Sequence, residues 1–476
     1  MYAFCCLLAT AVAFRGPASQ VAPARAAPLL RGAVEDHVTQ RAEDLLMAIV
    51  KDKTALGNDI KRNNQRTGGS AVLEGVTLER CDADGLDMSC VVRRRVGGFG
   101  RKYETGDERA NATWADLLPD DAAAAWAGGA DAQRRLMQVA CGLELPGAAA
   151  RLLDSAFPGG LGDAGRLPDN LWLNNIPASK LARRHMSDAC IAGVLDALGA
   201  PGAPSTLAVT IKPPELDVEM DTYRIGTLLE LVRSLTFAII SERGERVRVA
   251  VQAPMGEGIF AGMPLSLNGV RKLLSLMDWG PDAAQLMDDG YVRFGAVSGR
   301  PEDVDDKDDV FVLVAPQSIV GSSIVEPLRD MVEAAGRRKV ITINANLDDI
   351  QSSQGVMSYR GRGERLAFED AWREIFHFSL VVPIGRTFFP ILGAVVRPTL
   401  GSPYGLYQRM ERASDPRATF RDSRDRARAA AAGELTEVYR PVGCYAAMPT
   451  PKEQKAAFAA ALRDDFEREE ARKKEA

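Results

Sequence analysis

The chain has 476 residues, of which 46% are hydrophobic and 26% charged, and this balance supports two or three domains with buried cores. Its formal net charge is -5, and it becomes three charges more negative without Arg15, Arg25 and Arg31. An acidic protein of this kind is not expected to bind nucleic acid. The seven cysteines contain no C-x-x-C pair, which argues against a zinc ribbon or a disulfide scaffold and is typical of a reducing compartment.

Residues 1–31 have the composition of a two-part targeting leader. Residues 2–13 form an apolar run that ends in the Ala-Val-Ala of residues 11–13, a spacing that a signal peptidase accepts. The stretch that follows holds three arginines and no acidic residue before Glu35, as organelle transit peptides do. With Phe14 after the cleavage point, the leader resembles those of algae with red-lineage complex plastids. We therefore expect a protein of the plastid stroma, and plain secretion is the alternative.

Residues 32–200 show weaker periodicity and are interpreted as an α+β region of unknown role. Residues 34–50 place apolar side chains on one face of a helix. Two runs within residues 71–96 flank an Asp-Ala-Asp-Gly turn at 82–85, which predicts a β-hairpin. Residues 104–170 are rich in Ala, Gly and Asp, and their pattern assigns no chemistry.

Beyond a Gly- and Pro-containing linker at 199–205, apolar β-branched runs alternate with helical segments. The expected strands lie at 246–254, 292–297, 310–317, 339–343 and 378–383, and the expected helices include 223–240, 267–280 and 366–376. Strands separated by single helices predict βαβ crossovers and a mostly parallel sheet with helices on both faces. We therefore assign residues 201–450 to a Rossmann-like, three-layer α/β domain and residues 451–476 to a charged C-terminal helix.

Two local features of this domain carry specific expectations. Ser323 and Glu326 have the spacing of a capping box at the start of a helix that Gly336 ends. The window 378–396 is apolar enough to be weighed as a membrane span, but it contains an arginine and two prolines. We expect instead two core strands joined by a turn at Gly385-Arg386, and no transmembrane helix.

The known motifs of catalytic and ligand-binding sites are weak or missing in the sequence. The chain lacks the P-loop motif G-x-x-x-x-G-K-[ST], and the glycines of segment 256–262 favour a tight turn over a dinucleotide site. His37, His185 and His377 are far apart in sequence and offer little material for a Ser-His-Asp arrangement or a metal site. The acidic run 302–309 lacks the spacing of a calcium loop and is interpreted as a solvated connection between strands. We expect no metal, no cofactor and no catalytic residue.

Four blocks of sequence, in a set order and spacing, carry a resemblance to a known family. They are GEGIFAGMPLSLNGVRKLLSLMDWG (256–280), VFVLVAPQSIVGSSIVEPLRDM (310–331), VITINANLDD (340–349) and FFPILGAVVRPTLGSPYGLYQRME (388–411). On these blocks, the stretch from Thr206 to Met448 resembles the plastid domain-of-unknown-function family that includes the Low PSII Accumulation assembly factor of photosystem II. The resemblance implies a stromal or thylakoid-attached factor that works with membrane insertion machinery to insert a chlorophyll-binding core antenna subunit.

The predicted sheet itself indicates a site, because open parallel sheets bind ligands beyond the carboxyl ends of their strands. The polar residues expected at those ends are Gln252, Glu257, Gln317, Asn344 and Asn346. Side-chain amides can hydrogen-bond a peptide backbone, but they are poor acids, bases and nucleophiles. We therefore expect a partner-binding surface here, in a protein that is not an enzyme.

A second candidate surface is a set of arginines at the spacing of one helical face, Arg417, Arg421, Arg424 and Arg428. This face could contact anionic thylakoid lipid or an acidic partner. Aspartates between the arginines leave a solvated, salt-bridged helix as the alternative.

The sequence as a whole thus predicts a non-enzymatic plastid factor that assists photosystem II assembly. Its expected partners are photosystem II assembly intermediates, the thylakoid insertion machinery and the thylakoid surface, which it contacts peripherally. The alternative is a plastid enzyme that binds a nucleotide or another phosphorylated ligand at the same edge of the sheet.

The leader can be tested through Phe14. We expect residues 1–31 to carry a fluorescent reporter into the plastid, and F14A to strand the reporter before the innermost compartment. Fluorescence microscopy of the two fusions checks this expectation. Full import of the F14A reporter would count against a complex-plastid leader.

Overall fold

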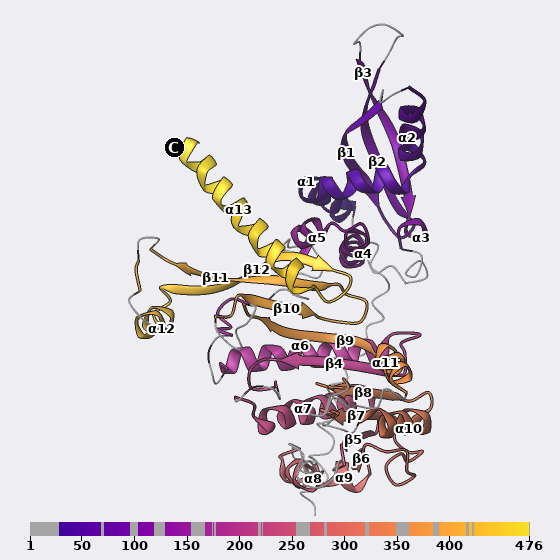
Figure 1. Cartoon of the computed structure of the whole chain (residues 1–476), viewed down its shortest axis with the longest axis vertical. Helices are drawn as coiled ribbons and strands as arrows, with labels where there is room; N and C mark the ends of the chain where they lie inside the picture. The colour runs from indigo at the N-terminus through magenta and orange to yellow at the C-terminus, as the bar shows by residue number, and fades with distance from the viewer. Residues whose placement is uncertain are drawn as a thin grey trace, which may run out of the picture. The chain divides into compact units, whose positions relative to one another are not determined.

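The computed structural model of the chain (Figure 1) describes residues 28–67, 71–95, 103–118, 129–153, 167–173, 175, 178–217, 220, 222–253, 267–279, 283–318, 323–348, 361–383, 390–415, 418–420 and 423–475. The chain forms two compact units. Unit 1 comprises Met1–Arg135 and Ala156–Gly162, and unit 2 comprises Leu136–Ser155 and Asp163–Ala476. The main boundary between the two units lies near residue 135 and not at the expected linker 199–205. Residues on both sides of that linker belong to unit 2, where α6 (Lys180–Gly199) packs against β4 (Thr206–Lys212).

Unit 1 is an α+β unit with a small antiparallel sheet. It contains α1 (Pro28–Lys53), α2 (Ala55–Thr67), β1 (Ala71–Cys81), β2 (Gly85–Arg95), β3 (Tyr103–Thr113), α3 (Trp114–Leu117) and the start of α4 (Gly129–Gly142). The strand order is β1-β2-β3, and α1 packs against β1. The predicted hairpin is confirmed. The third strand comes from the polar segment YETGDERANAT, whose sequence shows no alternation of apolar residues.

The amphipathic helix expected near the start of unit 1 is confirmed as part of α1. Val38, Ala42, Leu45 and Ile49 are completely buried. The backbone of Ala42 has φ -135° and ψ 32°, so α1 is kinked at this residue. Apolar side chains on both sides of the kink therefore contribute to the core of unit 1.

Unit 2 contains the larger sheet and the remaining elements. They are α5 (Pro146–Leu153), α6, β4, α7 (Ile225–Arg243), β5 (Val247–Val251), α8 (Leu267–Leu276), α9 (Ala283–Asp288), β6 (Val292–Ala296), β7 (Val310–Val314), α10 (Val325–Ala335), β8 (Lys339–Ile343), α11 (Arg362–Asp370), β9 (Arg373–Val381), β10 (Gly393–Arg397), β11 (Tyr404–Ala413), α12 (Ser423–Ala431), β12 (Leu435–Tyr445) and α13 (Pro451–Glu475). From β4 to β9 the strands are separated by helices or by a long connection, as the sequence predicts.

The sheet of unit 2 is mixed and mostly parallel. Its nine strands follow the order β12-β11-β10-β9-β4-β8-β7-β5-β6. All neighbours from β9 to β6 in this order are parallel, whereas β12, β11, β10 and β9 are antiparallel neighbours. The predicted α/β fold with a mostly parallel sheet is confirmed. The short connection between β10 and β11 requires an antiparallel pair, because a parallel pair needs a longer crossover, whereas β11 and β12 are joined by a longer segment that contains α12.

Helices cover both faces of the parallel strands (Figure 1). On one face, Val194 of α6 and Leu228 of α7 pack with Val209 of β4 in one core cluster. On the other face, Leu328 of α10 packs with Phe311 of β7. Residues of β5 and β7 are buried along their whole length, as expected for strands that are covered on both sides.

The boundary between α11 and β9 differs from the expectation. The sequence predicts a helix over 366–376, but α11 ends at Asp370 and β9 begins at Arg373. Pairing of β9 with β4 outweighs the local helical pattern of these residues. The two strands expected within 378–396 are confirmed as β9 and β10, and their turn lies outside the described residues. No described helix has the length and apolar character needed to span a membrane.

The capping box expected at the start of α10 is wrong, whereas the expected end of the helix at Gly336 is confirmed. The helix begins at Val325, whose backbone N–H donates to Ser323 Oγ at 3.1 Å, and the N-cap residue is Ile324, which has no side-chain hydrogen bond to the helix. Glu326 is therefore the second helical residue, whereas a capping box needs a carboxylate at the third. Gly336 ends the helix with a φ of 64°, which suits a residue without a Cβ.

The acidic run 302–309 is not a fully solvated connection, contrary to the expectation. Asp308 is completely buried, and its Oδ2 accepts a hydrogen bond from Arg248 Nε of β5 at 2.5 Å. Asp303 is also buried and accepts hydrogen bonds from Ala296 N and Ser298 Oγ. The buried ion pair between Asp308 and Arg248 therefore anchors this connection to β5. Within the described ranges, no group of His, Cys, Asp and Glu side chains could hold a metal ion.

The buried ion pair gives a test of this anchoring. D308N should lower the free energy of unfolding by about 3 kcal/mol, because Arg248 would keep a buried charge without its partner. Urea denaturation followed by circular dichroism measures the change. D306N is the matched control, since Asp306 is an exposed member of the same run, and it should cost less than about 0.5 kcal/mol. Equal stability of D308N and the wild type would contradict the anchoring role.

Candidate functional site

The order of the parallel strands reverses between β5 and β7, which are neighbours in the sheet. The chain leaves β5 toward β6 on one side and leaves β7 toward β8 on the other. In open α/β sheets, ligands bind beyond the carboxyl ends of strands at such a reversal. Gln252 directly follows β5, and Gln317 lies shortly after β7. Glu257 and the glycine-rich segment 256–262 lie outside the described residues.

Gln252 joins the two strands at this reversal. Its Nε2 donates to the carbonyl of Gln317 at 2.8 Å, and its Oε1 accepts from the backbone N–H of Gln317 at 2.8 Å. Only 1% of Gln252 is exposed. The side-chain amide of Gln252 thus makes the two hydrogen bonds that the backbone of a neighbouring strand would otherwise make. Gln252 therefore stabilises this edge of the sheet and does not present its amide to a partner.

Asn344 has a similar supporting role after β8. It adopts a left-handed backbone with a φ of 51°, a conformation that Asn tolerates better than most residues. Its Oδ1 accepts from Ile211 N at 2.7 Å, and its Nδ2 donates to the carbonyls of Ile211 and Leu216 at 2.8 and 3.0 Å. These bonds fix the end of β4 to the end of β8.

Gln317 and Asn346 lie next to each other at the ends of neighbouring strands. They form a parallel β-bridge through their main chains, with Asn346 N donating to Pro316 O at 2.9 Å. Both residues are half-buried. The Nε2 of Gln317 is buried and has no hydrogen-bond partner within the described part of the chain. A donor in this state favours a hydrogen bond with an incoming acceptor.

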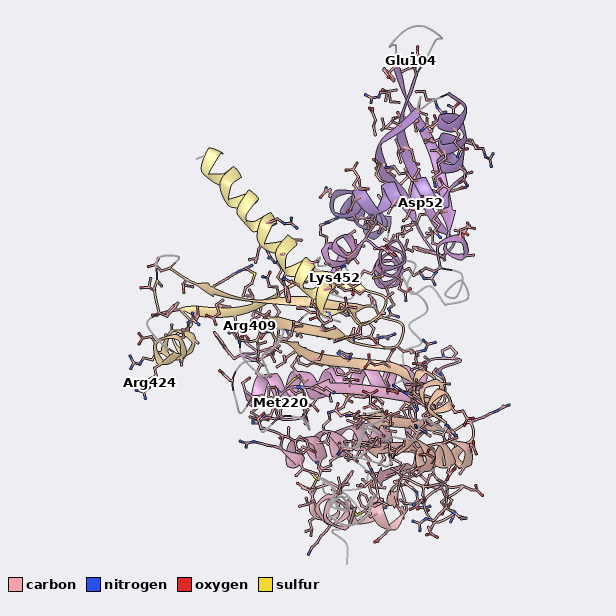
Figure 2. All side chains as sticks on the ribbon, viewed as in Figure 1. Asp52, Glu104, Met220, Arg409, Arg424 and Lys452 are labelled. Carbon is pink, nitrogen blue, oxygen red and sulfur yellow. The ribbon has the colours of Figure 1, made fainter. Side chains whose placement is uncertain are left out.

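The basic surface is only partly described. Arg424 (Figure 2) and Arg428 lie on α12, and both are exposed. Arg417 and Arg421 lie outside the described residues. Arg428 Nη1 is 3.6 Å from the carboxylate of Asp425. Exposed ion pairs of this kind are weak and do not prevent the arginines from contacting an anionic surface. Contact with lipid or an acidic partner stays a prediction.

A polar cluster on β9 is the feature that the sequence reasoning missed. His377 Nδ1 lies 3.0 Å from Glu374 Oε1, and its Nε2 lies 2.7 Å from Ser379 Oγ. Glu374 also accepts hydrogen bonds from Thr210 Oγ1 of β4 and from the hydroxyl of Tyr404 of β11. The register between β4 and β9 shifts next to Glu374, and this irregularity allows Glu374 and His377 to meet although their spacing along a regular strand would separate them.

The order Ser379, His377, Glu374 is that of a nucleophile, a base and an orienting carboxylate. Here the carboxylate is saturated by other donors, and 9% of the His377 side chain and 21% of the Glu374 side chain are exposed. Burial, together with the charge of Glu374, raises the pKa of Tyr404 to about 12, so the tyrosine remains a proton donor. The cluster therefore binds strands β4, β9 and β11 together. The polar residues in the apolar run REIFHFSLV are the signal that could have revealed it.

Glu374 gives this cluster a pH dependence. Burial works to raise the pKa of its carboxyl, but hydrogen bonds from His377, Thr210 and Tyr404 outweigh burial and hold the pKa below its ordinary value of 4.5. The unfolded chain therefore takes up the proton first as the pH falls. The stabilisation is complete above the ordinary pKa and is lost as the pH falls through the lower pKa of the folded state.

E374Q should remove this titration, so its free energy of unfolding should fall less steeply than that of the wild type below pH 4.5. Urea denaturation at neutral pH and at a series of acidic pH values measures both slopes. E364Q is the control, because Glu364 is an exposed carboxylate of α11. Parallel curves for E374Q and the wild type would show that Glu374 has no lowered pKa.

The fold defines the chain as an α/β protein with a mostly parallel sheet whose carboxyl edge carries amides. The family described as Domain of unknown function (DUF1995) matches residues 118–454, which is more than half of the chain. The chain belongs to this family. The family resemblance of the sequence blocks is thus confirmed, and the match begins well before Thr206, so that it includes α4, α5 and α6.

Proposed function

We propose that the chain is a non-enzymatic plastid factor that assists photosystem II assembly by helping to insert a chlorophyll-binding core antenna subunit. The proposal rests on the four sequence blocks and the targeting leader. Its site of action would be the stromal side of the thylakoid, which it would contact peripherally together with the insertion machinery. The exposed arginines of α12 would add contacts with anionic lipid or an acidic partner.

The observation that carries a recognition role is the buried Nε2 of Gln317, which has no partner among the described residues and lies at the strand reversal. Asn346 beside it supplies a second amide. A pair of amides offers donors and acceptors that match the carbonyl and N–H groups of a peptide backbone. The same groups supply neither an acid nor a nucleophile, which favours binding over catalysis.

The strand reversal also supports a second candidate function. In a Rossmann-like arrangement, which we propose for this sheet, the crevice beyond β5 and β7 is the place for a nucleotide or another phosphorylated ligand. A thermal-shift screen of the purified protein with nucleotides separates the two functions. A ligand at a hundred times its dissociation constant would stabilise the fold by roughly 2.7 kcal/mol.

The recognition role can be tested by changing Gln317 and Asn346 together to Ala. Because the backbone bonds of both residues remain, the double variant should keep its melting temperature and lose most of its capture of photosystem II assembly intermediates. Capture is measured with the tagged protein in solubilised thylakoids. Q252A serves as the contrasting control, since it removes two hydrogen bonds to the main chain of Gln317 and should destabilise the fold by about 2 kcal/mol. Normal capture by the stable double variant would remove these amides from the binding surface.

A further inference from the structure

A cavity of about 800 Å³ lies where the first halves of α6 and α7 meet the turn that follows β4. The two helices pack side by side on the same face of the sheet (Figure 1). Small-molecule sites have volumes of about 300 to 1,000 Å³, so the cavity can hold a metabolite or a lipid headgroup. Strands β8 and β7 stand between β4 and β5, so this cavity is separate from the crevice at Gln252 and Gln317.

The start of α7 lines the cavity with Arg224, Gly226 and Thr227. Arg224 occupies the N-cap position and provides no side-chain hydrogen bond to the first turn. Gly226 lines the cavity, and a Cβ at this position would meet no atom within 4 Å. The positive end of the helix dipole therefore faces open space, which favours an anion.

Cationic side chains line the same cavity as this helix start. Five of them line the cavity, and two of the five are already paired, Arg184 with Asp188 at 3.5 Å and Arg233 with Glu230 at 3.1 Å. The other three, Lys180, Arg183 and Arg224, are exposed and have no carboxylate partner within the described ranges. A multiply charged anion such as a phosphate matches this set.

The cavity is also lined by a buried carboxylate, that of Glu215. Only 1% of Glu215 is exposed, and its Oε1 accepts a hydrogen bond from Ala178 N at 3.0 Å. Its Oε2 is buried without a hydrogen bond to any described residue. An unsatisfied carboxylate oxygen is costly, so a ligand that donates a hydrogen bond to it would be favoured.

The position of Glu215 is fixed before a ligand arrives. Its carbonyl accepts from Arg224 N at 2.8 Å, and the next residue, Leu216, donates its N–H to Pro213 O at 2.9 Å. Asn344 Nδ2 holds the carbonyl of Leu216 from the neighbouring strand end. A ligand would therefore meet a preorganised acceptor, which reduces the entropy cost of binding.

We propose that this cavity binds a phosphate ester that also carries a hydroxyl group. The phosphate lies against the first turn of α7, where Lys180, Arg183 and Arg224 neutralise it. The hydroxyl donates its hydrogen bond to Oε2 of Glu215. The carbon part of the ligand packs against the apolar lining, to which Met186 and Leu231 belong.

Titration calorimetry with the full chain tests the two halves of this site separately. Glycerol 3-phosphate, which has both groups, should bind about tenfold or more tightly than inorganic phosphate, because a hydrogen bond to a charged acceptor is strong. E215Q should reduce this preference to less than about threefold and keep the affinity for inorganic phosphate, since an amide nitrogen in place of Oε2 accepts no hydrogen bond. R183Q/R224Q should weaken both ligands by about tenfold or more.

R243Q is the matched control, because it removes a cation from the far end of the same helix, where Arg243 pairs with Glu245. It should leave both affinities unchanged. Thermal unfolding of E215Q should show undiminished stability, which separates lost binding from lost folding. An unchanged preference in folded E215Q, or a wild type that binds neither probe, would overturn the proposal.

Vesicles distinguish the two natural sources of such a group. If the ligand is a lipid headgroup, phosphatidylglycerol vesicles should compete with glycerol 3-phosphate and should bind the wild type but not R183Q/R224Q. If it is a soluble phosphate ester, vesicles of phosphatidylglycerol and of phosphatidylcholine should both leave the titration unchanged. Either result supports the cavity as a site and names its source.

Discussion

The side-chain amide of Asn344 joins the end of β8 to a segment far away in the sequence, which comprises the end of β4 and the turn after β4. It does so with three hydrogen bonds to the main chain of Ile211 and Leu216, in a position where only 5% of Asn344 is exposed. Because the turn is held in this way, Glu215 keeps its place in the cavity between α6 and α7. Gln252 joins the ends of β5 and β7 in the same way, through two hydrogen bonds to the main chain of Gln317. Side-chain amides therefore stabilise the carboxyl edge of the sheet.

The sequence was sufficient to predict the parts of the fold that depend on local periodicity. Apolar runs such as that of β7 identify strands that are buried on both faces, and the helical spacing of α1 identifies its buried side. The carboxyl-edge position of Gln252, Gln317 and Asn344 also follows from this pattern. What each amide binds does not follow from it, because the partner of Gln252 is the backbone of a residue 65 positions away.

Other features depend on pairings that no local pattern contains. The contact between Glu374 and His377 needs the register irregularity against β4, and the strand assignment of residues 373–376 needs the same pairing. Asp308 lies in a run that has the composition of a solvated loop, and only the position of Arg248 in a neighbouring strand makes it an interior residue. Likewise, the segment that holds Glu215 has the sequence pattern of a proline turn, which predicts no ligand site. Only the packing of α6 and α7 beside this turn makes Glu215 part of a cavity.

Strand β9 belongs to both the parallel and the antiparallel part of the sheet, since it pairs with β4 on one side and β10 on the other. Thr210 of β4 and Glu374 of β9 are 164 positions apart. Ribosomes add about 5 to 20 residues per second, so roughly 10 to 30 seconds separate the synthesis of these two strands. For most of this interval both backbone edges of β4 lack a partner, because β8 is synthesised only shortly before β9, and either edge can template a wrong pairing with another chain. The nascent protein therefore carries an aggregation hazard that disappears in the folded state, where both edges of β4 are paired.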